Sequence, residues 1–309
     1  MNWQPAATAD GLRRRAELLT RIRDFFSARG VLEVETALLC GSGVTDPAIE
    51  PFVVASGAST DGPRFLQTTP EYTMKRLLAA YGEPIYQIAR AFRDGEAGAR
   101  HNPEFTLLEW YRPGLDLHAL MDEVTELVAT CIGRRDEVRY SYREAFGHYL
   151  YLDPFTASDD ELRDCVRDHV DVGDMTGDRD LWLDLLMSHV IEPQLPGLCF
   201  IHDYPASQAA LAKIVAVDDV VVGQRFELYV DGLELANGYR ELTDPVEQRS
   251  RFEADNARRR ERGQQERPVD EYLLAAMEHG LPECSGVALG VDRLLMVAMG
   301  KMDIRDVLA

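Results

Sequence analysis

The stretch from Arg90 to Gly114, RAFRDGEAGARHNPEFTLLEWYRPG, predicts the central hairpin of this fold. Residues 83–95 are typical of a strand that runs into a turn, and residues 105–113 alternate as an antiparallel partner does. Because alternate side chains of a strand share one face, we expect a binding surface on this hairpin. Its candidate residues are Arg93, Asn102, Phe105, Glu109 and Tyr111.

Arg93 gives the hairpin its expected chemistry. A guanidinium fork matches the paired oxygens of a phosphate or a carboxylate, and an aromatic ring such as that of Phe105 can stack on a base. A surface hairpin with an ordinary ion pair between arginine and glutamate explains the same pattern. From these residues alone, both interpretations stay open.

Outward from the hairpin, helical and strand patterns follow one another in an irregular order. Residues 214–239 are rich in strand formers, and Asp231-Gly232 predicts a tight hairpin turn between two strands. Helices are expected at residues 11–29, 71–81, 116–133, 157–170, 179–192, 244–263 and 269–279, and after Gly290. Because the strands mostly form hairpins, the predicted class is α+β, with an antiparallel sheet flanked by helices. No repeat or linker divides the chain, so residues 1–309 are expected to form one domain.

The composition excludes several functional classes. A net charge of -20 repels a phosphate backbone, which disfavours broad binding to nucleic acids. No apolar run approaches the length of a membrane span, and the charged N-terminal stretch is unlike a signal peptide. We therefore expect a cytoplasmic protein without a membrane partner. The five cysteines are scattered without a CxxC pair, which fits neither a disulfide framework nor a zinc site.

The segment ELANGYRELTD carries two glutamates, Glu234 and Glu241, on either side of Asn237. Carboxylates and an amide in this arrangement can hold Mg²⁺ beside phosphates or capture an ammonium group. Residues seven apart on a regular strand lie on opposite faces, so we expect a bulge at Asn237-Gly238 that brings both carboxylates to one face. The alternative is a polar strand edge with no ligand.

The segment GVALGVDRL places Gly290 in a turn and Arg293 in the first turn of a helix. An arginine at a helix N-terminus favours an anion site. The alternative is a plain helix start, with Asp292 as a favourable N-terminal charge and Arg293 in a salt bridge.

Taken in order, these segments and TTPEYTMKRLL, at residues 68–78, resemble the signature motifs of class II aminoacyl-tRNA synthetases, most closely the lysine-specific branch. GVLEVET, PASQAALA, LANGYRELTD and CSGVALGVDR are similar to a truncated paralogue family, the elongation factor P–(R)-β-lysine ligases. The resemblance covers nearly the whole chain. It implies the class II fold, with the catalytic domain alone and no anticodon-binding domain.

The same resemblance implies an activity. A member of this family is an AMP-forming ligase that uses ATP and Mg²⁺ to activate (R)-β-lysine, or lysine, as the adenylate. It then transfers the amino acid to a lysine side chain of elongation factor P. We therefore expect elongation factor P and a diamino acid as partners, no stable binding of tRNA, and a homodimer.

The resemblance also implies a role for each candidate residue. Arg93 and Arg293 would be the catalytic arginines, at the α-phosphate and the γ-phosphate. The ATP site would comprise Arg93, Gly95, Asn102, Phe105, Glu234, Leu235, Gly290 and Arg293. The amino-acid site would comprise Thr69, Pro70, Glu71, Tyr111, Glu241 and Ala288, with Tyr111 and Glu241 at the distal ammonium. Glu234 would bind Mg²⁺, with Glu241 as a second candidate.

Two positions depart from the family pattern. Gly95 stands where an Arg-x-Glu motif has its glutamate, and Glu96 follows one position later. Ala37 replaces a proline of the first motif. Ala288 stands where lysyl-tRNA synthetases have a glycine near the amino-acid pocket; the resemblance implies that its methyl group suits a substrate whose amino group has moved, and simple strand packing is the alternative. Two alternatives therefore stay open: an amino-acid-activating enzyme that serves another acceptor, and a catalytically silent regulatory module.

Overall fold

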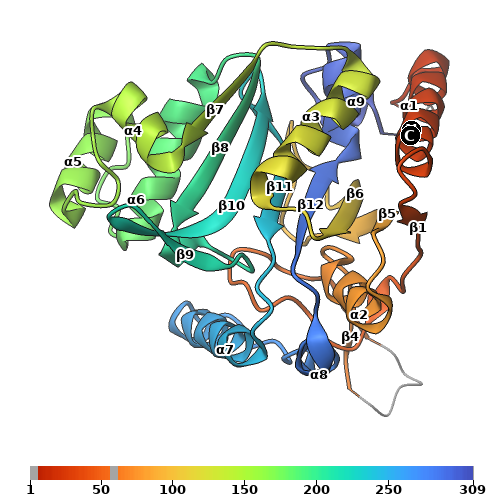
Figure 1. Cartoon of the computed structure of the whole chain (residues 1–309). Helices are drawn as coiled ribbons and strands as arrows, with labels where there is room; N and C mark the ends of the chain where they lie inside the picture. Colours follow the sequence, from red (N-terminus) through yellow and green to blue (C-terminus); the bar gives the residue numbers. More distant parts are fainter. Residues whose placement is uncertain (1–5, 56–61, 309) are drawn as a thin grey trace. The chain divides into compact units, whose positions relative to one another are not determined.

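The computed structural model describes residues 6–55 and 62–308 and divides into two compact units (Figure 1). Unit 1 comprises Met1–Leu115, Thr130–Ile132 and Thr243–Ala309, and unit 2 comprises Asp116–Ala129 and Gly133–Leu242. The expectation of one domain over the whole chain stays a prediction.

The sheet of unit 1 contains the hairpin that was predicted at residues 83–95 and 105–113. Its strands lie in the order β1, β5, β6, β12. They span Leu32–Glu33 (β1), Ile85–Phe92 (β5), Glu104–Pro113 (β6) and Cys284–Gly290 (β12). β5 and β6 are antiparallel from Ile85 opposite Tyr111 to Phe92 opposite Glu104, as predicted. β12 is antiparallel to β6, whereas the short β1 is parallel to β5, which the hairpin pattern did not predict.

Aromatic packing attaches the first helix, α1 (Ala9–Ser27), to this hairpin. The Phe26 ring stacks on Tyr86 of β5 at a centroid distance of 4.4 Å and meets Trp110 of β6 edge-on at 5.3 Å. All three side chains are buried. Aromatic pairs of this kind add stability beyond the area that they bury, so they help to fix α1 on the hairpin.

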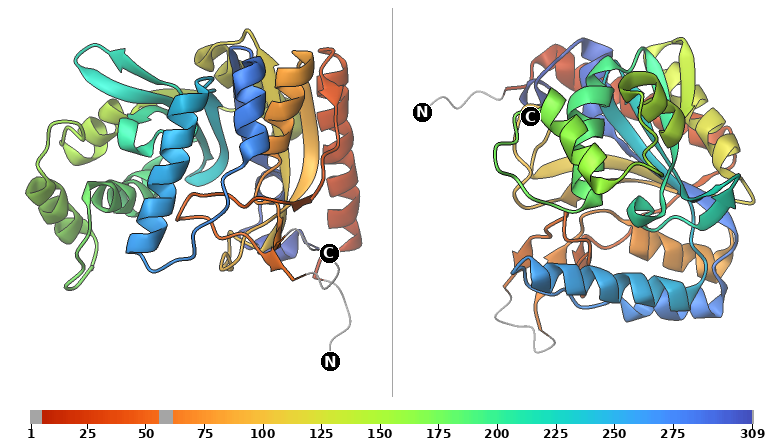
Figure 2. Two further views of the ribbon diagram at one scale, coloured as in Figure 1. Left: turned by 90° about the horizontal axis from the view of Figure 1, so that it is seen from below. Right: turned by 90° about the vertical axis from the view of Figure 1, so that its left-hand side faces the viewer.

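A further group of helices in unit 1 comprises α2 (Glu71–Tyr81), α7 (Pro245–Glu261) and α8 (Glu271–Gly280). α8 packs against both α2 and α7, and the three lie side by side in Figure 2. A small sheet of β2 (Leu39–Cys40), β4 (Arg64–Leu66) and β3 (Val53–Val54) completes this part of the unit. The bounds of α2 agree with the helix predicted at residues 71–81.

Unit 2 contains a sheet in the order β11, β10, β8, β7. Its strands span Leu233–Arg240 (β11), Val220–Val230 (β10), Leu198–Pro205 (β8) and Glu137–Ser141 (β7), and β9 (Ile214–Val217) pairs with β10. Asp231 and Gly232 connect β10 to β11 with φ values of 49° and 74°, which confirms the predicted hairpin turn. β7 and β8 are parallel, again outside the predicted pattern.

Helices of unit 2 pack on β8 around Tyr142, Phe146, Trp182 and Leu186, all of which are buried. They are α4 (Tyr142–Leu150), α5 (Asp159–His169) and α6 (Arg179–Leu186), and α3 (Leu117–Ile132) lies mostly in this unit. The sequence did not predict α4, although Ser141 and Glu144 form a capping box at its start. The α+β class with a mostly antiparallel sheet is confirmed. Within the described part of the chain, no helix is long and apolar enough to cross a membrane.

Asp292 joins three elements of unit 1 at the start of α9 (Val291–Met299). Its carboxylate accepts hydrogen bonds from the Thr106 amide of β6 at 2.6 Å and from Arg15 Nη1 of α1 at 2.5 Å. Arg15 Nη2 also donates to the Thr106 hydroxyl at 2.7 Å. Asp292 is therefore a buried cross-link rather than only a charge at a helix terminus.

We predict that Asp292→Ala lowers the free energy of unfolding by about 3 kcal/mol, because it leaves the Arg15 guanidinium and the Thr106 amide without their acceptor. The control is Asp10→Ala, which removes an exposed ion pair to Arg14 and is expected to change stability little. Urea denaturation of both variants measures the difference. Equal midpoints would contradict the cross-linking role of Asp292.

Candidate active site

The register of the unit 1 sheet places predicted residues of β6 and β12 side by side. Glu109 of β6 lies directly opposite Gln87 of β5 on one side and Ala288 of β12 on the other. Tyr111 follows two residues later on the same face of β6. Ala288 is therefore next to Glu109, and the sheet brings it into one row with the hairpin residues.

Glu109 lies at the centre of a hydrogen-bonded cluster. Its two carboxylate oxygens accept hydrogen bonds from the Thr69 hydroxyl at 2.5 Å and from the Tyr111 hydroxyl at 2.6 Å. The Thr69 hydroxyl in turn accepts from the Glu71 amide at 3.2 Å, and Lys75 Nζ donates to the Glu71 carboxylate at 2.5 Å. We call these five residues the Glu109 cluster. Pro70 precedes α2 directly and so lies between Thr69 and Glu71.

Burial and charge make the cluster electrostatically unusual. Burial, followed by the negative charge of Glu71, raises the pKa of Glu109 to about 8. Hydrogen bonds from Thr69 and Tyr111, and the charge of Lys75, act in the opposite direction. At neutral pH the carboxyl group therefore tends to hold a proton, and a cation beside it would favour its ionised form.

Glu109 is the main residue to which the sequence assigned no role. The signal was present, because a glutamate inside the apolar run LLEWY is expected to be buried, and a buried carboxylate needs partners. What the sequence did not show is that Thr69, forty residues away, supplies one of those partners.

A second group of predicted residues lies at the turn after β5. The Arg93 guanidinium lies 5.1 Å from the centroid of the Phe105 ring, and its Nη1 is 3.5 Å from a Glu96 carboxylate oxygen. Arg93 Nε also donates to the Thr68 carbonyl at 3.4 Å. Because Thr68 precedes Thr69, this contact links Arg93 to the edge of the Glu109 cluster. The expected arrangement of Arg93 beside Phe105 is present.

The loop residues Gly95 and Asn102 have local roles. Gly95 has a φ of +81°, a conformation that L side chains rarely adopt, so a glutamate at this position would be strained. The neighbouring Glu96 is directed at Arg93. Asn102 Nδ2 donates to the Glu104 carbonyl at 2.6 Å and closes the turn into β6.

Arg293 lies in the first turn of α9, as predicted. Its Nε donates to the Arg100 carbonyl at 3.2 Å, and its Nη2 is 2.7 Å from His101 Nε2. Gly290 precedes the helix with a φ of -73°, and a Cβ there would meet atoms of Arg293 at 3.7 Å or more. The local backbone therefore does not itself require glycine at this position.

The remaining candidates, Glu234, Leu235 and Glu241, lie in unit 2. Leu228 pairs with Ala236, and Tyr229 pairs with Glu234, so Leu235 is the extra residue of β11. The predicted bulge at Asn237-Gly238 is therefore wrong in position, because the register there is regular. Because Leu235 is an extra residue between Glu234 and Ala236, the alternation of faces shifts by one, and Glu234 and Asn237 lie on the same face of β11.

Glu241 follows β11 directly and forms an isolated bridge with Ala212. Its side chain is buried. Continued alternation from Asn237 places Glu241 on the face that also carries Glu234. The sequence predicted this shared face, but from an extra residue at Asn237-Gly238 rather than at Leu235. Arg225 Nε donates to Asn237 Oδ1 at 3.3 Å and so helps to fix this face.

No group of three or more histidine, cysteine, aspartate or glutamate side chains that could hold a metal ion occurs among residues 6–55 and 62–308. A Mg²⁺ site at Glu234 and Glu241 therefore stays a prediction. Two carboxylates on one face fit an ion that takes most of its ligands from water and phosphates.

Comparison with known proteins agrees with these motifs. The family model "tRNA synthetases class II (D, K and N)" matches residues 2–309. The elongation factor P–(R)-β-lysine ligase of Proteus mirabilis is 49% identical over 316 residues, which cover 100% of this chain and 97% of that protein. The ligases of the same name from Yersinia enterocolitica and Photorhabdus laumondii are 46% and 48% identical, with the same coverage.

The raised pKa of Glu109 predicts how stability depends on pH. Between the ordinary value of 4.5 and about 8, the folded chain holds a proton that the unfolded chain has released. Stability from this group is therefore present at low pH and is lost as the pH rises through that range. We expect wild type to lose on the order of 3–4 kcal/mol from pH 5 to pH 8 relative to Glu109→Gln, which cannot ionise.

Denaturation at a series of pH values measures this difference. Glu266→Gln serves as the control, because it neutralises an exposed glutamate and is expected to keep the wild-type slope. Parallel curves for wild type and Glu109→Gln would show that the pKa of Glu109 is not raised.

Proposed function

Because the chain belongs to the class II tRNA synthetase family of the D, K and N type, we propose that it is an ATP-dependent ligase that activates (R)-β-lysine, or lysine. The acceptor we propose is a lysine side chain of elongation factor P. The printed names of full-length relatives support this acceptor. The observation that carries the proposal is the buried Glu109 cluster, which lies next to the Arg93–Phe105 pair.

The Glu109 cluster supports a diamino acid as substrate. An ammonium group that enters a pocket loses its hydration and needs a carboxylate and further acceptors. Glu109 supplies the carboxylate, and the Tyr111 hydroxyl that donates to it is held beside it. We propose that the distal ammonium displaces the proton of Glu109, and that Glu241 contributes a second negative charge. Thr69, Pro70, Glu71 and Ala288 would shape the rest of the amino-acid site.

Arg93 and Phe105 support a nucleotide next to this site. The guanidinium would bind the α-phosphate and the substrate carboxylate, and the ring would stack on adenine. Arg293 would bind the γ-phosphate. Asn102, Gly95, Gly290, Glu234 and Leu235 would complete the ATP site. We propose Glu234, with Glu241 as second candidate, as the protein ligand of Mg²⁺, which reduces the charge on the phosphates when bound.

The chemistry then requires positioning and charge neutralisation more than proton transfer. The substrate carboxylate attacks the α-phosphorus, a carboxylate–phosphorus bond forms, and pyrophosphate leaves. An ionised carboxylate needs no general base, so Arg93 and Arg293 act by holding the reacting oxygens in line and by stabilising their charge. In the second step the acceptor amine attacks the carbonyl carbon, AMP leaves with the bonding electrons, and the amine proton passes to solvent.

We further propose that the protein acts in the cytoplasm as a homodimer and does not bind tRNA stably. The net charge of -20 supports the last point, because it opposes a polyanion. Exchange of pyrophosphate into ATP, with lysine and with (R)-β-lysine, tests activation, and mass measurement of elongation factor P tests transfer. Activation without a mass gain on elongation factor P would favour another acceptor, and no exchange with either amino acid would favour a silent module.

We predict that Arg93→Ala and Arg293→Ala each lower the rate of pyrophosphate exchange roughly a hundredfold, because each removes a positioned charge from the reacting phosphates. Arg90→Ala is the matched control on the same hairpin, since its ion pair with Glu104 is exposed and lies on the strand before the loop. Melting curves on the same samples show that the fold survives. Near-normal exchange in both variants would exclude these arginines from the nucleotide site.

A further inference from the structure

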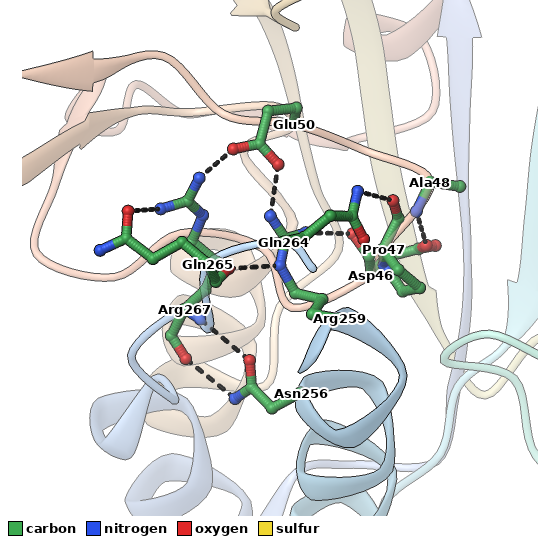
Figure 3. A network of polar contacts seen from close by, with 9 residues as sticks. All are labelled: Asp46, Pro47, Ala48, Glu50, Asn256, Arg259, Gln264, Gln265 and Arg267. Carbon is green, nitrogen blue, oxygen red and sulfur yellow. Dashed lines mark hydrogen bonds and ion pairs between the residues drawn. The ribbon is translucent and has the colours of Figure 1, made fainter. Parts of the chain in front are cut away.

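Two buried arginines of unit 1 converge on one carboxylate, that of Glu50 (Figure 3). The side chains of Arg259, in α7, and Arg267, after α7, are 0% and 5% exposed. Each donates to a different oxygen of Glu50. We call these three residues the Glu50 cluster.

The Glu50 cluster is electrostatically one-sided, with two cations for one anion. Carbonyl groups supply further acceptors: Arg259 donates to the Gln265 carbonyl at 2.8 Å and to the Asp46 carbonyl at 2.9 Å. A buried guanidinium without a counter-charge is unfavourable by several kcal/mol. Glu50 therefore compensates both arginines, and both arginines fix its carboxylate in place.

Neighbouring contacts fix the chain that follows α7 and join it to Pro47, before Glu50. The Asn256 side chain forms two hydrogen bonds of 2.9 Å with the main chain of Arg267, which fixes the course of that residue. Gln264 Nε2 donates to the Pro47 carbonyl at 3.0 Å. Figure 3 shows these contacts below and to the right of the Glu50 carboxylate.

The main chain of Glu50 links this cluster to the proposed nucleotide site. The Asp94 amide donates to the Glu50 carbonyl at 2.7 Å, and the two residues form an antiparallel bridge. Asp94 lies between Arg93 and Gly95, whose φ of +81° turns the chain away from β5. The bridge thus meets the loop directly after Arg93.

We infer that Glu50 is a positioning residue: its carboxylate, held by Arg259 and Arg267, fixes the main-chain bridge to Asp94 and thereby the place of Arg93. Glu50 touches no reacting atom. The effect on the loop stands on geometry alone, whereas the effect on ATP rests on the proposed function.

The test uses three variants of the full chain. Glu50→Gln keeps the shape and removes the charge. The double variant Glu50→Gln/Arg267→Gln also removes one of the two cations that Glu50→Gln leaves without a counter-charge, which is expected to restore part of the stability. Arg260→Gln is the control, because it neutralises an exposed arginine of the same helix.

Hydrogen–deuterium exchange of the Asp94 amide reports on the loop, and melting curves report on the fold. We expect the Asp94 amide to exchange about tenfold faster in Glu50→Gln and in the double variant, even though the double variant melts at a higher temperature than Glu50→Gln. The KM for ATP in pyrophosphate exchange is expected to rise about tenfold in both. Arg260→Gln is expected to change none of these quantities.

The outcomes separate the inference from the proposed function. If Glu50→Gln does not fold, the double variant carries the test. Unchanged exchange of the Asp94 amide in a folded variant would overturn the inference. Faster exchange with an unchanged KM for ATP, in an active enzyme, would overturn it as well. Either result would leave the Glu50 cluster with a purely structural role. Faster exchange in a chain whose wild type shows no pyrophosphate exchange would support the positioning of the loop and refute the proposed function.

Discussion

The carboxylate of Glu109 lies almost entirely out of water within the sheet of unit 1, and its partners are hydroxyl groups rather than a directly bound cation. The positive charge of Lys75, which acts on Glu109, is already paired with Glu71. Burial in this setting opposes ionisation, which is why the pKa of Glu109 is raised to about 8. A site built in this way favours a ligand that brings a positive charge, and this property underlies the preference for a diamino acid.

Two other acid groups of unit 1, the buried Asp292 and the partly exposed Glu50, have different partners and different consequences. Asp292 is paired with Arg15 and holds β6, and Glu50 is paired with two arginines and holds the loop after β5. In both, the charge is compensated within the protein, so each serves to fix the chain. Asp292 thus fixes strand β6, and Glu50 fixes the loop that follows Arg93. The carboxyl group of Glu109, in contrast, can change its ionisation when a ligand binds.

Short-range patterns predicted much of this structure. Alternation predicted the β5–β6 hairpin, Asp231-Gly232 predicted the turn between β10 and β11, and the motif residues predicted that Arg93 and Phe105 lie together. Features set by distant parts of the chain were missed. Glu50 and its arginines are 209 and 217 residues apart, and the extra residue of β11 at Leu235 depends on the register of β10. A local sequence pattern does not predict such pairings, because the paired residues lie far apart in the sequence or depend on the register of another strand.

Counting the protons released when (R)-β-lysine binds tests the role of Glu109 most directly. Calorimetric titrations at pH 7, in buffers of different ionisation enthalpy, give this number for wild type and for Glu109→Gln. If the ammonium displaces the proton of Glu109, wild type releases about one proton for each ligand bound, and the variant releases about one fewer. Binding to wild type without proton release would contradict the account, because Glu109 would then be ionised before the ligand arrives or would not meet it.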